Sequence, residues 1–241
     1  MRILALDSTA VAASVCLMDG EKIVADCYQN TRQTHSQTLM PMVQFAMQCA
    51  GWQMRDVDLL AVSAGPGSFT GVRIGISCIK GLAFPDHKPC CGVSVLQAMA
   101  ENFSHQDGRI CAVMDARCRQ VYNALFEIKN GKVIRLCEDR ALTLDELRED
   151  LLKRGEGTYI LMGDGALLCR QAPELSGLSD AGILLKMAPE TLCMQRASGV
   201  ARAAIKAYNE EKTVNGDKLL PVYLRLPQAQ RELKKRQEGA K

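Results

Sequence analysis

The sequence predicts an α/β protein made of two similar lobes, each with the element order βββαβα. Three observations lead to this prediction. The same order of apolar strand and helix patterns occurs twice along the 241 residues, a hairpin dipeptide joins the second and third strands of each copy, and the first strand of each copy contains an aspartate near its end. With 47% hydrophobic and 24% charged residues, the composition is that of an ordinary globular protein.

The first copy occupies the first hundred residues. Asp19-Gly20 is the expected hairpin turn, and Gly51 ends a helix whose apolar stripe begins at Leu39. Pro41 lies inside that stripe, so we expect the helix to begin late or to kink there. In chain order we predict strands over 2–9, 13–19 and 22–29, a helix over 39–50, a strand over 58–64 and a helix over 70–84.

The second copy begins after residue 108. Asn130-Gly131 is its hairpin turn, and Thr143 with Glu146 forms a capping box that opens a helix. A long helix then follows over about 190–212. The remaining predictions are strands over 109–116, 120–128 and 132–138, a helix over 144–155, a strand over 158–165 and a short helix over 165–172.

These elements divide the chain into two lobes and a C-terminal segment. We expect residues 1–103 and the helix at about 190–212 to form the first lobe, 104–189 a smaller second lobe, and 213–241 a segment with a basic tail. Ligands of α/β sheets bind beyond the carboxyl ends of the strands. Asp7, Asp115 and Gly163-Asp164-Gly165 all follow or end strands, which predicts that they face a cleft between the lobes.

Charge, cysteines and apolar runs limit the class of protein. The tail 231–241 has five basic and two acidic residues, a net charge of +3. This equals the net charge of the whole chain, so the rest of the chain is near neutral. The tail either contacts nucleic-acid phosphates or is a solvated chain end. The start of the sequence turns polar at Asp7, too early for a signal peptide, and no apolar run is long enough to span a membrane. Eleven cysteines without a CxxC pair indicate reduced thiols, and therefore a cytoplasmic protein.

The two-lobe plan resembles the actin/hexokinase-like (ASKHA) superfamily, and several motifs make the resemblance more specific. The segments ILALDST, HSQTLMPMV, SAGPGSFTGVRIGISCIKGLA, GVSVLQAMA, MDARCRQVYNALF and PVYLR resemble the TsaB (YeaZ) family over nearly the whole chain. The resemblance implies a non-catalytic subunit that binds and activates TsaD for the synthesis of N6-threonylcarbamoyladenosine beside the anticodon of tRNA. It also implies a complex with the ATPase TsaE, a homodimer when the protein is alone, and contact with tRNA through the complex.

The glycines of the segment 65–81 have three explanations. A phosphate loop is the weakest, because the GxxxxGK[ST] pattern and its lysine are missing. Gly71, Gly75 and Cys78 share one stripe of the predicted helix, with Gly81 beside it, and small side chains let another helix approach closely. That helix is either 39–50 of the same chain or a helix of a partner.

The resemblance favours the partner, because TsaB proteins dimerise, with themselves or with TsaD, through the helices that match 36–50 and 70–84. The implied interface residues are His35, Leu39, Thr70, Gly71, Arg73, Ile74, Gly75, Cys78 and Gly81.

Nucleotide binding stays an alternative. In nucleotide-binding members of the superfamily, the first strand-turn of each lobe holds phosphate and metal, so the resemblance suggests ADP or ATP with magnesium at the subunit interface, although the chain requires no cofactor of its own. The other interpretation is that the aspartates cap local backbone donors. The candidate residues are Asp7, Ser8, Thr9, Asp115, Gly163 and Gly165.

An enzyme of the same fold, either a glycoprotease-like peptidase or an ATP-dependent phosphotransferase, is the alternative function. The sequence gives it little support. His35, His87 and His105 are far apart, with no HxxxH or HExxH pattern, and Ser68 is not in a GxSxG elbow. We therefore predict no catalytic residue and no metal site.

Overall fold

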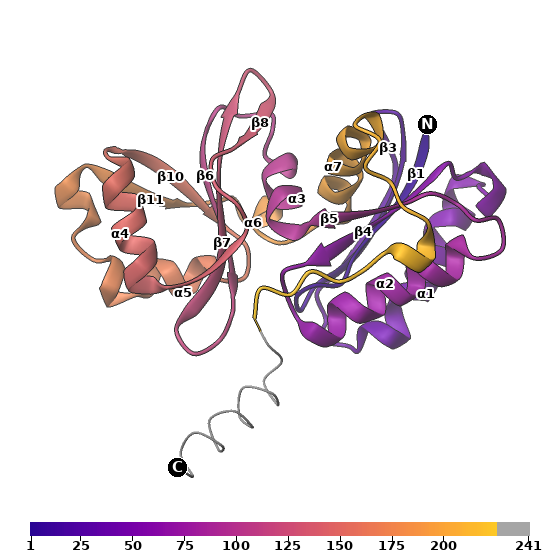
Figure 1. Cartoon of the computed structure of the whole chain (residues 1–241), viewed down its shortest axis with the longest axis horizontal. Coiled ribbons are helices and arrows are strands. Elements are labelled where there is room, and N and C mark those ends of the chain that lie inside the picture. Colours follow the sequence, from indigo (N-terminus) through magenta and orange to yellow (C-terminus); the bar gives the residue numbers. More distant parts are fainter. Residues whose placement is uncertain (226–241) are drawn as a thin grey trace, which may run out of the picture.

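The computed structural model describes residues 1–225 and consists of two α/β lobes side by side (Figure 1). The basic tail predicted at 231–241 lies outside the described residues. Each lobe is built around one sheet, with the strand order β3-β2-β1-β4-β5 in the first lobe and β11-β10-β6-β7-β8 in the second. In the second sheet, β9 additionally pairs with β7.

The first sheet is buried on both faces. Leu4 and Leu6 of β1 point toward α1 and α2, whereas Ile3 and Ala5 point toward α7, because successive side chains of a strand alternate between the two faces. The strands are β1 (Arg2–Asp7), β2 (Ala13–Asp19), β3 (Lys22–Gln29), β4 (Leu59–Gly65) and β5 (Cys90–Ser94), and the helices are α1 (His35–Ala50), α2 (Phe69–Ala83), α3 (Val95–Asn102) and α7 (Ala197–Asn209).

The second sheet carries its helices around a separate apolar core, which includes Leu125, Leu147 and Tyr159. Its strands are β6 (Gly108–Asp115), β7 (Gln120–Lys129), β8 (Lys132–Arg135), β9 (Arg140–Thr143), β10 (Gly157–Met162) and β11 (Ile183–Met187). Its helices are α4 (Leu144–Arg154), α5 (Ala166–Gln171) and α6 (Glu190–Cys193). Four short 3-10 turns complete the described chain, at Met54–Asp56, Pro173–Leu175, Leu178–Ala181 and Gly216–Lys218.

The predicted turns and the cap are confirmed. Gly20, Asn130 and Gly131 have positive φ angles at the two hairpin turns, and Thr143 and Glu146 exchange both hydrogen bonds of the capping box. Pro41, by contrast, does not delay the first helix, because α1 begins at His35 and contains the proline.

The predicted long helix over 190–212 is wrong. The chain forms α6 and α7 instead, separated by residues 194–196, where Arg196 is extended at a φ of −143°. The buried Gln195 of this break turns its side chain toward Asp164 of the second lobe. The break therefore lets the chain cross from the second lobe to the first, where α7 packs on the sheet.

Four elements were not predicted: β5, α3, β9 and β11. Helix α3 contacts both lobes, because Leu96 and Met99 lie in the core of the second lobe while Ala98 packs with α7. Residues 95–102 are therefore shared between the lobes rather than confined to the first.

The helices of the described chain and its cysteines bear on membrane insertion and on disulfide bonding. None of the helices formed by residues 1–225 has the length and apolar character needed to span a bilayer. All eleven cysteines are free, and most are buried or half-buried, whereas Cys49 and Cys118 are exposed.

Candidate functional site: the helical face and the interlobe cleft

Helices α1 and α2 lie side by side on the same face of the first sheet and present an outward surface, which we call the α1–α2 face (Figure 1). Exposed positions repeat every three or four residues along each helix, as one outward side requires. On α1 they are Gln37, Pro41, Phe45 and Cys49, and on α2 with its C-cap they are Thr70, Arg73, Ser77, Gly81 and Phe84.

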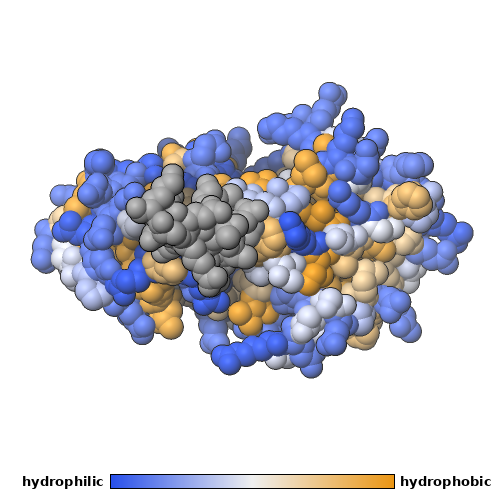
Figure 2. Space-filling view, turned by 60° about the horizontal axis from the view of Figure 1, so that its bottom comes forward, coloured by the Kyte–Doolittle hydropathy of each residue, from blue (hydrophilic) through white to orange (hydrophobic). Residues whose placement is uncertain are grey.

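Two exposed aromatic rings stand on this face. The side chain of Phe45 is 61% exposed and that of Phe84 is 78% exposed, whereas Leu39 and Ile79 of the same helices are fully buried. Figure 2 shows the molecule from below the view of Figure 1. Hydrophobic residues, in orange, lie among the polar residues on the surface of the first lobe. The face is therefore chemically suited to be covered by another surface.

The proposed role of Gly71 and Gly75 as bare contacts for a partner is wrong, because both glycines face inward. A Cβ atom on Gly71 would lie 2.0 Å from the Ser8 carbonyl oxygen, and one on Gly75 would lie 2.7 Å from Ser8 Oγ. Ser8 Oγ also donates a hydrogen bond to the Gly71 carbonyl at 2.9 Å. The glycines let α2 approach the turn after β1, so the internal explanation holds, with Ser8 rather than helix 39–50 as the neighbour.

Small residues do occur on the outward side of α2, but at other positions. Gly81 is exposed with no atom within 4 Å of an added Cβ, and Ser77 lies one turn before it. Ile74 and Cys78 are half-buried beside this stripe. The small-residue stripe that the sequence placed on 71, 75 and 78 therefore lies on the neighbouring side of the helix.

Four other predicted interface residues differ in how far they are exposed. Thr70 and Arg73 are exposed on the face, as predicted for contact residues. Leu39 is fully buried in the core of the first lobe, which contradicts its assignment to the interface. His35 is half-buried, with its Nε2 atom 2.7 Å from the Ala10 carbonyl oxygen.

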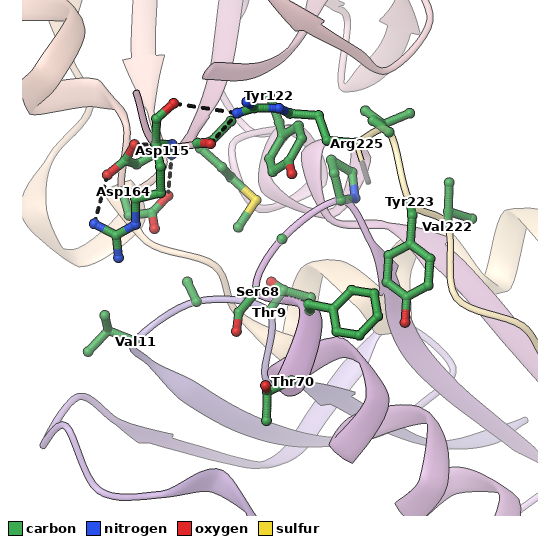
Figure 3. A pocket seen from close by; sticks show the side chains of 18 residues that line it. Thr9, Val11, Ser68, Thr70, Asp115, Tyr122, Asp164, Val222, Tyr223 and Arg225 are labelled. Atoms are coloured by element: carbon green, nitrogen blue, oxygen red, sulfur yellow. Dashed lines mark hydrogen bonds and ion pairs between the residues drawn. The ribbon is translucent and has the colours of Figure 1, made fainter. Parts of the chain in front are cut away.

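A cavity of about 400 Å³ lies between the lobes, at the carboxyl ends of β1 and β6 (Figure 3). Its walls come from the turn after β1, the start of α2, the turn after β6 and the C-terminal segment. The polar side chains among its lining residues are Thr9, Ser68, Thr70, Asp115, Arg117, Tyr122, Asp164, Tyr223 and Arg225.

Asp7 does not reach this cavity, although the sequence placed it there. Its carboxylate is fully buried and accepts hydrogen bonds from Ser63 Oγ at 2.5 Å and from the backbone N–H and hydroxyl of Thr9 at 2.9 and 2.8 Å. Burial raises the pKa of Asp7, and the hydrogen bonds from Ser63 and Thr9 oppose that rise. The carboxylate therefore holds the turn together, which is the capping role that the sequence left open.

Asp115 and Asp164 do line the cavity, and they lie next to each other. The backbone N–H of Asp115 donates to Asp164 Oδ1 at 3.2 Å, while the Asp115 carboxylate pairs with Arg117 at the same distance. Burial raises the pKa of Asp164, and the negative charge of Asp115 raises it further. Gln195 reaches Asp164 from behind at 3.5 Å.

Gly163 and Gly165 serve the packing of this turn. A Cβ on Gly163 would lie 2.0 Å from the Val113 carbonyl oxygen, and one on Gly165 would lie 2.9 Å from the Met114 carbonyl carbon. Both glycines therefore bring the end of β10 against β6, and neither opens room for a phosphate.

The side chains do not fit a nucleotide in the manner expected from the superfamily. Asp7 and Ser8 are turned into the first lobe, and only Thr9 and Asp115 of the six candidate residues line the cavity. Among residues 1–225, no three His, Cys, Asp or Glu side chains come together as metal ligands would.

The C-terminal segment contributes cleft residues that the sequence analysis missed. Tyr223 stacks on Phe69 at 4.5 Å between ring centroids, and Arg225 Nη1 donates to the Ala116 carbonyl across the cleft. The motif PVYLR was noted as part of the family resemblance, but its contacts join residues more than a hundred positions apart, and no local pattern reveals them.

Comparisons with known proteins show which family the chain belongs to. The family model of TsaD, described as tRNA N6-adenosine threonylcarbamoyltransferase, matches residues 28–231. The tRNA threonylcarbamoyladenosine biosynthesis protein TsaB of Escherichia coli (strain K12) is 33% identical over 229 residues, covering 93% of this chain and 95% of the relative. The chain belongs to the TsaB family. TsaB of Bacillus subtilis (strain 168) is 30% identical over 95% of this chain and 96% of its own.

A solved structure extends the TsaB likeness to three dimensions. An uncharacterised Pseudomonas aeruginosa protein, described as similar to the peptidase YeaZ, aligns with a TM-score of 0.77 at 27% identity. The alignment covers 93% of this chain and 99% of that one. The predicted two-lobe α/β fold of a TsaB protein is therefore confirmed.

Proposed function

We propose that this chain is a non-catalytic docking subunit, which binds a TsaD protein and activates it for threonylcarbamoyl transfer to adenosine in tRNA. The proposal draws on the names of the relatives, which assign them to tRNA threonylcarbamoyladenosine biosynthesis. The TsaD family model also matches most of the chain, so the proposed partner has a related fold. Two related folds can meet through equivalent helices, as two copies do in a symmetric dimer.

The observation that carries the proposal is the α1–α2 face. Ser77 and Gly81 leave the outward side of α2 without bulk, so a partner helix could approach its backbone closely. Phe45 and Phe84 are exposed beside these two small residues and offer aromatic anchors of the kind that contribute much of the binding energy at interfaces. A surface of this kind suits helix-on-helix docking.

The interlobe cleft supports a docking role over the enzymatic alternative. The Asp7 carboxylate is committed to Ser63 and Thr9, and Arg225 of the chain itself bridges the cleft. A nucleotide with magnesium at the subunit interface would therefore depend on side chains of the partner. We assign no catalytic residue to this chain.

The remaining parts of the assembly follow from the same face and family. We propose that the isolated chain forms a homodimer through the α1–α2 face, because a twofold contact uses the same patch on both copies. An ATPase of the TsaE kind would join the complex with TsaD, the complex as a whole would contact tRNA, and the protein would work in the cytoplasm.

A charge placed on the α1–α2 face tests the proposal. We expect Phe45→Asp and Gly81→Glu to weaken binding to the TsaD of the same organism at least about 30-fold, because a hot-spot loss of 2 kcal/mol corresponds to that factor. Both positions are exposed, so the melting temperature of the isolated chain should hardly change when it is measured at a concentration at which the homodimer has dissociated.

Leu167→Asp is the matched control, because Leu167 is an exposed apolar residue of the second lobe. Affinity is measured by calorimetry and transfer activity by tRNA modification in the reconstituted system. The proposal fails if both face variants bind TsaD like the unaltered chain, or if Leu167→Asp weakens binding equally.

A further inference from the structure

We propose that residues 219–225, here called the C-terminal strap, couple the α1–α2 face to the interlobe cleft, so that closure of the cleft and binding at the face favour each other. The strap runs past α2 to the junction of the lobes (Figure 1). The inference rests on the proposed function for the identity of the partner, whereas the internal coupling concerns the isolated chain.

The strap is seated on the first lobe through its backbone. Leu219 is buried against Gly92, and the Val222 N–H donates to the Ala64 carbonyl at 2.8 Å. The Val222 carbonyl oxygen comes so close to Gly65 that a Cβ there would lie at 2.3 Å. Gly65 has a φ of +126°, so this seat depends on a residue without a side chain.

Near its middle, the strap contacts Arg73 of the α1–α2 face through Tyr223. The Tyr223 ring stacks on Phe69, at an angle of 24° between the ring planes, and the Tyr223 hydroxyl accepts a hydrogen bond from Arg73 Nε at 2.9 Å. The Arg73 guanidinium lies 3.9 Å from the centroid of the Phe69 ring. The position of the Arg73 charge on the exposed face therefore depends on where Tyr223 lies.

At its end the strap reaches the second lobe. Arg225 Nη1 donates to the carbonyl of Ala116 and lies 3.4 Å from that of Arg117, in the turn that follows β6 (Figure 3). Arg117, Cys118 and Arg119 of this turn have φ angles of 65°, 55° and 54°, a left-handed conformation that side chains rarely adopt. Charge-assisted hydrogen bonds from one guanidinium hold the carbonyls at the start of this turn.

The two contacts are only two residues apart, and this spacing produces the coupling. If the lobes separate while Arg225 keeps its hydrogen bonds, the strap is pulled, and Tyr223 moves away from Phe69 with it. A partner that covers Arg73 in its present position stabilises Tyr223, the strap and the closed cleft together. Such coupling is reciprocal, and values of 5- to 150-fold in affinity are typical of coupled sites.

Hydrogen–deuterium exchange on the full-length chain, at a concentration at which it is monomeric, tests the coupling without a partner. We expect Arg225→Ala to speed amide exchange not only in 116–120 but also at Val222 and in the first turn of α2. We expect Tyr223→Phe, which keeps the ring and loses the hydroxyl, to speed exchange across the cleft in 116–120. If each variant changes exchange on its own side alone, the coupling is overturned.

Affinity for TsaD then tests whether the coupling extends to the face. Arg225→Ala should weaken binding at least fivefold, although Arg225 lies in the cleft. Lys153→Ala, an exposed cation on α4 of the second lobe, is the control and should leave affinity unchanged. An unaltered affinity for Arg225→Ala would refute the link to the face. If the unaltered chain fails to bind TsaD, the proposed function is refuted instead, and the exchange experiment still decides the internal coupling.

Discussion

At the scale of the residue, two carboxyls show how surroundings decide what a side chain can do. Asp7 and Asp164 both lie near the ends of predicted strands, and the sequence therefore predicts both near the cleft. Asp7 is instead turned inward by Ser63, which comes from β4 and is 56 positions away. A strand-end aspartate can be predicted from local sequence, but its direction depends on partners that the fold supplies.

The raised pKa of Asp164 leads to a prediction about stability and pH. The unfolded chain ionises at the ordinary aspartate pKa, about 3.9, whereas the folded chain holds its proton to a higher pH. The unfolded state therefore releases the proton first, and the contribution of Asp164 to stability falls as the pH rises through this window.

Asp164→Asn removes that titration and keeps an oxygen for the Asp115 N–H. The unaltered chain should lose stability relative to this variant as the pH rises from about 4, by about 1.4 kcal/mol for each unit of pKa shift, and the difference should then level off. Urea unfolding of both proteins between pH 4 and 8 measures it. A difference that is constant with pH, or that grows in favour of the unaltered chain, would refute the assignment.

At the scale of the element, the limits of α2 were predicted within one residue, but its orientation was not. The sequence placed the helix over 70–84, and the structure has it at Phe69–Ala83. Glycine and serine both have small side chains, so small residues occur on two sides of α2. One side carries Gly71 and Gly75, and the other carries Ser77 and Gly81. Their spacing alone could not decide which side faces outward. The Ser8 turn decides this, because it needs Gly71 and Gly75 beneath it.

The missed strands have a related cause. β5, β9 and β11 are four or five residues long, and β5 and β11 pair in parallel with strands far away in the chain. Short segments carry too little periodicity to be recognised, and parallel pairing leaves no hairpin turn in the sequence. The strands joined by Asp-Gly and Asn-Gly were found because these turns mark them, even β8, which has only four residues.

Matched alanine substitutions test the orientation of α2. Gly71→Ala should lower the free energy of unfolding by about 1–3 kcal/mol, because its methyl group would overlap the Ser8 carbonyl. Gly81→Ala should raise it by about 0.5–1 kcal/mol, because alanine favours the helix and nothing lies within 4 Å. Denaturant unfolding of the two variants gives both values. Equal effects at the two positions would contradict the orientation of α2, in which Gly71 faces the core and Gly81 faces outward.

At the scale of the whole molecule, the first lobe is the base of the α1–α2 face and of the C-terminal strap. The first lobe buries its sheet between α1–α2 and α7, so the α1–α2 face stands on a close-packed core. The strap then joins this lobe to the second through Tyr223 and Arg225. The two-lobe plan could be predicted from the repeated order of elements, whereas the strap could not, because its contacts span the length of the chain.

The central claim is that a TsaD protein docks on the α1–α2 face, and exchange mapping of the complex tests it most directly. Amide exchange of this chain is compared with and without saturating TsaD, at a concentration at which the chain alone is monomeric. The account predicts the strongest protection in peptides from 35–50 and 69–84, with weaker protection at 116–120 through the strap. Protection confined to the second-lobe strands β10 and β11, with none in α1 and α2, would contradict it.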